Sequence, residues 1–316
     1  VCHAAAAAAR RPLYAHLAEG AAVSLPLPEI QIFGGGAHAG RRVDIQDFLV
    51  MCPGAGSFAE ALARTAEVYR AAGRLLADSG RLQGVADEGG WWPAFSTNEE
   101  ALDMLMRAIE AAGYVPGQDV FIALDVAASE FGSGGAYTLG LERRALDRAA
   151  FAELLLSWVR RYPVLSIEDP FGEDDPEGFR LFAGALGGRA QIVGDDLLVT
   201  DAGRVRDAAG RGLVNCALIK PNQAGTLTET RQALEAARTG GLSAIVSARS
   251  GETEDLTIAH LAVGWNAGQV KVGSITRGER TAKWNELLRI EEALSGQAGF
   301  AGWAALPPGV RAAWSA

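Results

Sequence analysis

Two lysines in this chain of 316 residues stand at the ends of apolar, strand-like runs, where an amine can do acid–base chemistry. Lys220 closes the run 214–219, and Lys271 closes the run 268–270. Only three of the 29 lysine and arginine residues are lysines, which indicates a need for a cation that can lose its proton, as a guanidinium cannot. At the end of a barrel strand, such a lysine is a candidate for a catalytic base or for a point charge that holds an anion.

Three other strand-like runs end in carboxylates, at Asp125, Glu168 and Asp195. If the strands converge at one edge, these anions repel one another unless a cation neutralises them. A ligand set made only of oxygen atoms favours Mg²⁺ or Mn²⁺ over zinc. The alternative for each carboxylate is that it caps the following helix.

This combination predicts removal of a proton next to a carboxylate. The enolate that forms carries two negative charges, which Mg²⁺ and a lysine can hold. Lys220 is the candidate base. For that role we expect its pKa to be lowered by a divalent metal and by a cationic neighbour.

The elements that must position these residues follow an α/β pattern. Two strands over 28–33 and 45–51 precede two long helices over 57–79 and 97–112. Strands then alternate with helices, and the later strands are expected at 119–125, 163–168, 190–194, 214–219, 243–247 and 268–272. This number of nearly continuous apolar strands favours a closed barrel, with an open doubly wound sheet as the alternative.

Composition narrows the classes of partner. The formal net charge is −9 and the pI is about 5.1, without a basic stripe, so no nucleic-acid partner is expected. The sequence has no uninterrupted apolar run of about 20 residues, so no membrane span is expected. The three cysteines are scattered and fit a reducing cytoplasm, which is the predicted location.

Several longer motifs resemble the enolase family. They run in order along residues 1–294 and include 87–90 (Asp-Glu-Gly-Gly), 125–131 (Asp-Val-Ala-Ala-Ser-Glu-Phe), 166–171 (Ser-Ile-Glu-Asp-Pro-Phe), 193–197 (Val-Gly-Asp-Asp-Leu), 250–255 (Ser-Gly-Glu-Thr-Glu-Asp) and 287–292 (Leu-Leu-Arg-Ile-Glu-Glu). The resemblance implies an enolase-type (β/α)8 barrel over 25–295 that starts ββαα and continues as (βα)6. It also implies a residual helix and connection over 1–24 and a carboxyl-terminal tail over 296–316 that packs on the barrel. Full-length members carry an amino-terminal α+β capping domain, which we expect to be lost or not covered here.

The resemblance also implies roles for individual residues. The Mg²⁺ ligands correspond to Asp125, Glu168 and Asp195, and the general base corresponds to Lys220. Glu88 corresponds to the acid that assists departure of hydroxide, and Lys271 to a second lysine that engages the substrate carboxylate.

The substrate side carries the remaining candidates and the departures from the family pattern. Arg249 and Ser250 correspond to the phosphate grip, and His38 to an active-site histidine. Gln46 and Asp47 stand where enolases usually have Gln-Glu, so the acid is one methylene shorter. Ala248 replaces a histidine and cannot hydrogen-bond to substrate, and Trp91 and Trp92 replace smaller residues near Glu88.

Three functions remain open at this point. The first is reversible dehydration of 2-phosphoglycerate to phosphoenolpyruvate. The second is a specialised enolase-like enzyme of phosphonate or phosphinate natural-product biosynthesis, similar to a carboxyphosphonoenolpyruvate synthase, in which a transferase-type reaction replaces dehydration. The third is a non-catalytic binding or scaffold protein. The expected ligand is a small phosphorylated or phosphonylated carboxylic acid, and the resemblance implies a homodimer.

Overall fold

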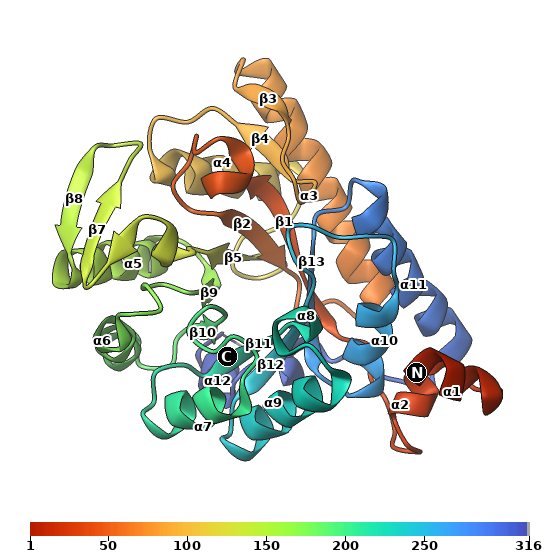
Figure 1. The fold of residues 1–316 in the computed structure, drawn as a ribbon. Helices are drawn as coiled ribbons and strands as arrows, with labels where there is room; N and C mark the ends of the chain where they lie inside the picture. Colours follow the sequence, from red (N-terminus) through yellow and green to blue (C-terminus); the bar gives the residue numbers. More distant parts are fainter. Residues whose placement is uncertain (315–316) are drawn as a thin grey trace.

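The computed structural model describes residues 1–314, apart from the side chain of His38. Its main sheet closes into a barrel, because the last strand pairs with the first (Figure 1). Strands β1 and β2 are antiparallel to each other, β2 is antiparallel to β5, and every later barrel neighbour is parallel. In barrel order, the strands are β1 (Leu27–Gly34), β2 (Asp47–Met51), β5 (Phe121–Asp125), β9 (Val164–Glu168), β10 (Gln191–Gly194), β11 (Cys216–Ile219), β12 (Ser243–Ser247) and β13 (Gly268–Gly273). The closed barrel is confirmed, and the open sheet is excluded.

Helices surround this barrel, and two of them follow the first strand pair as predicted (Figure 1). In α3 (Phe58–Asp78) the side chain of Ser57 accepts the first-turn N–H of Glu60, and α4 (Asn98–Ala111) has a similar amino-terminal cap. The later strands are followed by α5 (Arg148–Arg161), α6 (Pro176–Leu186), α7 (Ala202–Gly210), α8 (Pro221–Ala224), α9 (Leu227–Thr239), α10 (Thr257–Gly264) and α11 (Gly278–Leu294). The order ββαα(βα)6 is therefore present. None of the described helices has the length and apolar character that a membrane crossing requires.

Two groups of short strands were not predicted from the sequence. A hairpin of β3 (Leu82–Val85) and β4 (Trp91–Pro93) lies between α3 and α4, and β4 extends the main sheet beside β1. Its turn carries Glu88. A separate sheet of β6 (Gly132–Ser133), β7 (Ala136–Leu139) and β8 (Arg144–Asp147) lies beside α5 at the edge of the barrel (Figure 1).

The two ends of the chain pack against the barrel from different sides. Near the amino terminus, α1 (Cys2–Ala8) is followed by α2 (Leu13–Leu17), which packs on α10. Near the carboxyl terminus, the short helix η3 (Gly302–Ala305) and α12 (Pro308–Trp314) bury apolar side chains against the end of the barrel opposite the acidic strand ends. Phe121, at the start of β5, meets the rings of Trp303 and Trp314 edge-on at 5.2 and 5.3 Å. This packing closes that end of the barrel and leaves the other end for chemistry.

An aromatic cluster anchors the outer helices to the strand that carries Glu168. Phe171, which follows β9, lies within 6.0 Å of four other rings. These are the rings of Tyr137, Phe151, Phe179 and Phe182, all of which are buried.

Candidate active site

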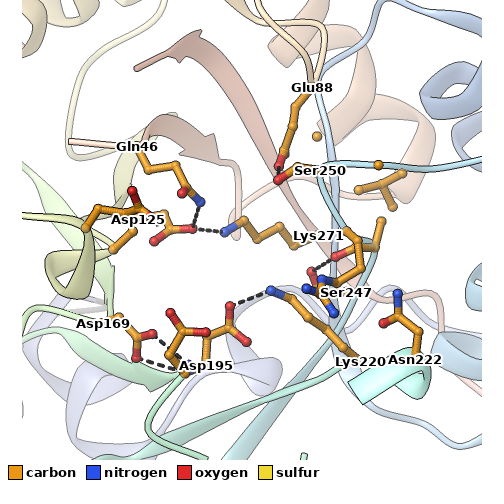
Figure 2. A pocket seen from close by; sticks show the side chains of 18 residues that line it. Gln46, Glu88, Asp125, Asp169, Asp195, Lys220, Asn222, Ser247, Ser250 and Lys271 are labelled. Atoms are coloured by element: carbon orange, nitrogen blue, oxygen red, sulfur yellow. Dashed lines mark hydrogen bonds and ion pairs between the residues drawn. The ribbon is translucent and has the colours of Figure 1, made fainter. Parts of the chain in front are cut away.

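The predicted site residues meet at one end of the barrel, around a cavity of about 490 Å³ (Figure 2). The carboxyl ends of the parallel strands and the amino-terminal end of β2 converge there, so residues far apart in sequence become neighbours. Of the predicted residues, those lining the cavity are Gln46, Glu88, Asp125, Asp195, Lys220, Arg249, Ser250 and Lys271. Asp47 and Glu168 are almost fully buried beside them. The backbone of His38 belongs to the short helix η1 (Gly36–Ala39), and its side chain lies outside the described residues.

Lys271 projects from β13 into a group of carboxylates (Figure 2). Its Nζ atom lies 2.7 Å from Asp125 Oδ2 and 2.7 Å from Glu168 Oε2. Asp47 Oδ2 is farther away, at 3.7 Å. Burial by itself lowers the pKa of Lys271, but the charges of Asp125 and Glu168 outweigh it and hold that pKa well above the usual range. Lys271 is therefore a fixed ammonium, suited to holding an anion.

Lys220 follows β11 and pairs with Asp195 (Figure 2). The other oxygen of Asp195 accepts a hydrogen bond from Gln223 Nε2 at 2.9 Å. Burial by itself lowers the pKa of Lys220, but the charges of Asp195 and Glu168 outweigh it and raise that pKa. The lowered pKa expected beside a divalent metal stays a prediction. Lys220 has the position expected of a base, but it is protonated while this ion pair persists.

Asp169 was missed from the sequence although it adjoins Glu168 in the same motif. Its buried carboxylate accepts the backbone N–H groups of Asp195 at 2.9 Å and Asp196 at 2.7 Å, and so holds the loop after β10. Carboxylate oxygens of these three aspartates lie within 4.8 Å of one another, close enough to share a cation. The adjacent acidic residues at 168–169 and 195–196 were the sequence signal for these further ligand candidates. Only the first residue of each pair was predicted as a metal ligand.

The donor set fits a hard divalent cation. Burial, followed by the charge of Asp125, raises the pKa of Glu168 well above its usual range even though Lys271 is beside it. Glu168 Oε1 is buried and has no hydrogen-bond partner among the described residues. A buried carboxylate oxygen without a partner is costly, and coordination of a cation would remove that cost. Asp125, Glu168, Asp169, Asp195 and Asp196 together offer enough oxygen atoms for Mg²⁺.

A second acidic group faces the same cavity from the opposite side. Glu88 Oε1 accepts a hydrogen bond of 2.9 Å from Ser250 Oγ (Figure 2). The nearby Gln46 donates to Asp125 Oδ2 at 3.0 Å, which links β2 to the metal-ligand candidates. Burial and the charge of Glu88 raise the pKa of Asp47 well above its usual range, although Lys271 opposes this. This side of the cavity can therefore hold and donate protons.

The departures from the family pattern fall into two groups. Ala248 lines the cavity, and its methyl group contributes no donor or acceptor to that wall. By contrast, neither Trp91 nor Trp92 is among the described residues that line the cavity. Trp91 instead stacks on Tyr69 of α3, with ring centroids 4.6 Å apart. Trp91 therefore packs on Tyr69, whose hydroxyl holds the turn that carries Glu88, and neither tryptophan is part of the described cavity wall.

Comparisons with known proteins agree with this geometry. A family model described as "Enolase, C-terminal TIM barrel domain" matches residues 22–307. A protein named "Enolase 1" from Desulfitobacterium hafniense (strain Y51) is 50% identical over 292 residues, which cover 92% of this chain and 67% of that relative. A protein named "Enolase" from Rubrobacter xylanophilus (strain DSM 9941) is 48% identical over 308 residues, which cover 98% of this chain and 72% of that relative.

Proposed function

This chain belongs to the enolase family of lyases, and we propose that it uses Mg²⁺ to remove the proton next to the carboxylate of 2-phosphoglycerate or a close analogue, giving a phosphoenolpyruvate-type product. The observation that carries the proposal is the arrangement of Lys220 and Lys271. They enter one cavity from different strands and each contacts carboxylates that can bind a metal.

Each part of the site has a role in this reaction. Asp125, Glu168 and Asp195 would hold Mg²⁺, with Asp169 and Asp196 beside them. When bound, Mg²⁺ supplies positive charge for the enolate that develops next to the substrate carboxylate. Lys271, a fixed ammonium, adds a second positive charge to that carboxylate.

Proton removal is the role of Lys220. Its Nζ takes the carbon-bound proton, and the electron pair of that bond moves toward the carboxylate. The amine must be neutral to do so. Engagement of Asp195 with a cation would weaken the ion pair that now raises the pKa of Lys220, and the pKa would fall.

Departure of the neighbouring substituent is the role of Glu88. A proton from its carboxyl group lets hydroxide leave as water when the carbon–oxygen bond breaks. Ser250 orients this group through the 2.9 Å hydrogen bond, and Arg249 is placed at the cavity wall to bind a phosphate or phosphonate.

A second candidate, the specialised enzyme of phosphonate or phosphinate biosynthesis, is favoured by Ala248 and Asp47. Ala248 offers no hydrogen bond on the wall beside Arg249, and Asp47 Oδ2 has no hydrogen-bond partner among the described residues. Both features change the polar groups available in or beside the cavity. A different set of polar groups there would suit a different leaving group, while both lysines are retained.

An assay with purified protein, 2-phosphoglycerate and Mg²⁺ tests the proposal. We expect absorbance growth from the enol phosphate product, which EDTA abolishes. Mg²⁺-dependent binding without turnover would favour the second candidate. If the protein shows no turnover and no metal-dependent binding, the proposed activity is refuted and a scaffold role is left.

The base assignment needs its own variant. Lys220→Ala should abolish exchange of the carbon-bound proton with solvent while Mg²⁺ still raises the melting temperature. If Lys220→Ala still exchanges the carbon-bound proton with solvent, Lys220 is not the base. The homodimer and the cytoplasmic location stay predictions, which light scattering and cell fractionation test.

A further inference from the structure

Gln31 on β1 contacts Asp47 and the turn that carries Glu88, both on the leaving-group side of the site. The residue is fully buried, and both ends of its amide are used. Its Nε2 donates to Asp47 Oδ1. Its Oε1 accepts the backbone N–H of Gly90 at 2.7 Å, in the turn that carries Glu88.

The structure around Gln31 allows this double contact. Asp47 lies on β2, which pairs with β1, and the register between these strands shifts between Gln31 and Phe33. A Cβ atom on Gly90 would lie 2.5 Å from Gln31 Oε1, so a side chain at that position would push the turn away from the amide. The close approach of the turn to β1 therefore depends on glycine at 90.

Other groups also hold the backbone of the Glu88 turn. Ser274 N–H donates to the Glu88 carbonyl at 2.8 Å. The hydroxyls of Tyr69 and Thr276 both donate to the Gly89 carbonyl, at 2.9 and 2.5 Å. Of these contacts, that of Gln31 is the one that also extends to Asp47.

We propose that Gln31 is a positioning residue that fixes Asp47 relative to Glu88, and thereby serves departure of the leaving group and not removal of the carbon-bound proton. This inference rests on the proposed function. Asp47 is one methylene shorter than the glutamate usual in the family, and Gln31 reaches it from the neighbouring strand. Without the amide donor, Asp47 Oδ1 would join Oδ2 as a buried oxygen lacking a hydrogen-bond partner.

Two variants of the full chain separate the parts of this role. Gln31→Met keeps a similar length but removes both hydrogen bonds. Gln31→Glu keeps the acceptor for the Gly90 N–H and places a carboxylate against Asp47. Tyr69→Phe is the matched control, because the Gly89 carbonyl keeps its bond from Thr276 and Asp47 is not touched.

The readout is the ratio of two rates measured with 2-phosphoglycerate and Mg²⁺: formation of the enol phosphate, and exchange of the carbon-bound proton with deuterated water. We expect both Gln31 variants to lower product formation about 10- to 100-fold while proton exchange stays within about twofold of wild type. Tyr69→Phe should leave the ratio within about twofold. Thermal unfolding with Mg²⁺ checks that each variant is folded.

The outcomes are distinguishable. Equal loss of both rates in the Gln31 variants, or loss of neither, overturns the positioning role. Recovery of product formation in Gln31→Glu would show that the contact with the turn is sufficient, which overturns the part played by Asp47. If the wild-type protein catalyses neither product formation nor proton exchange, the proposed function is overturned, and this inference with it.

Discussion

Replacing Glu29 by glutamine should stabilise the protein at pH 8 far more than at pH 5, relative to wild type. Glu29 lies on β1 with its backbone paired to Lys271 of β13, and only 1% of the residue is exposed. Its Oε2 atom has no hydrogen-bond partner among the described residues. Burial raises the pKa of Glu29 from 4.5 to about 7, although the charge of Lys271 opposes the shift.

The sign and size of the effect follow from this pKa. The folded protein binds the Glu29 proton more tightly than the unfolded chain, so this stabilisation is fully present below pH 4.5 and is lost as pH rises to about 7. At 1.36 kcal/mol per pH unit, the shift corresponds to roughly 3 kcal/mol, of which about 2.5 kcal/mol falls between pH 5 and pH 8. Glutamine has no proton to lose and escapes this loss.

Urea unfolding of wild type and Glu29→Gln in EDTA, at several pH values between 5 and 8, measures the effect. The difference in free energy of unfolding should move in favour of the variant by about 2.5 kcal/mol across this range. Glu110→Gln on the exposed face of α4 controls for the loss of one carboxyl group without burial. A difference between Glu29→Gln and wild type that does not change with pH would refute the reasoning, since Glu29 would then titrate alike in the folded and unfolded chains.

The remaining predictions concern the metal, the aromatic cluster and the loop after β12. Mg²⁺ at 100 times its dissociation constant should add about 2.7 kcal/mol to the free energy of unfolding, and an equal gain in Asp195→Asn would argue against that ligand. Phe171→Ala should lose about 3–5 kcal/mol in urea unfolding, because four ring contacts are removed; a loss below 1 kcal/mol would mean that the cluster repacks. Arg280→Met frees the carbonyl groups of Arg249 and Ser250, and we expect the KM for 2-phosphoglycerate to rise about tenfold with little change in kcat. An unchanged KM would exclude this support of the loop.

The sequence by itself determined the barrel and which residues belong to its active end. The apolar runs that became β9, β12 and β13 were located to within a residue at each end, because buried parallel strands need nearly continuous apolar side chains. Acidic and basic residues directly after such runs must lie at the same end of the sheet, whatever the loops do. Lys220 and Asp195 could therefore be assigned to one site before any contact was known.

The β3–β4 hairpin could not be predicted from runs of apolar residues, because its strands are short and only partly buried. It matters for function, since its turn is what carries Glu88 into the cavity.

Tertiary structure alone decided how the charges are arranged and what supports them. Which carboxylate each lysine contacts depends on side-chain distances between separate strands, and these pairings raise the pKa of Lys220. Gln31 and Glu29 carry no signal in the sequence, since a polar residue within a strand is ordinary. They become informative only when the closed barrel removes them from water and places them beside Asp47 and Lys271, because a buried polar group must find a partner or a proton.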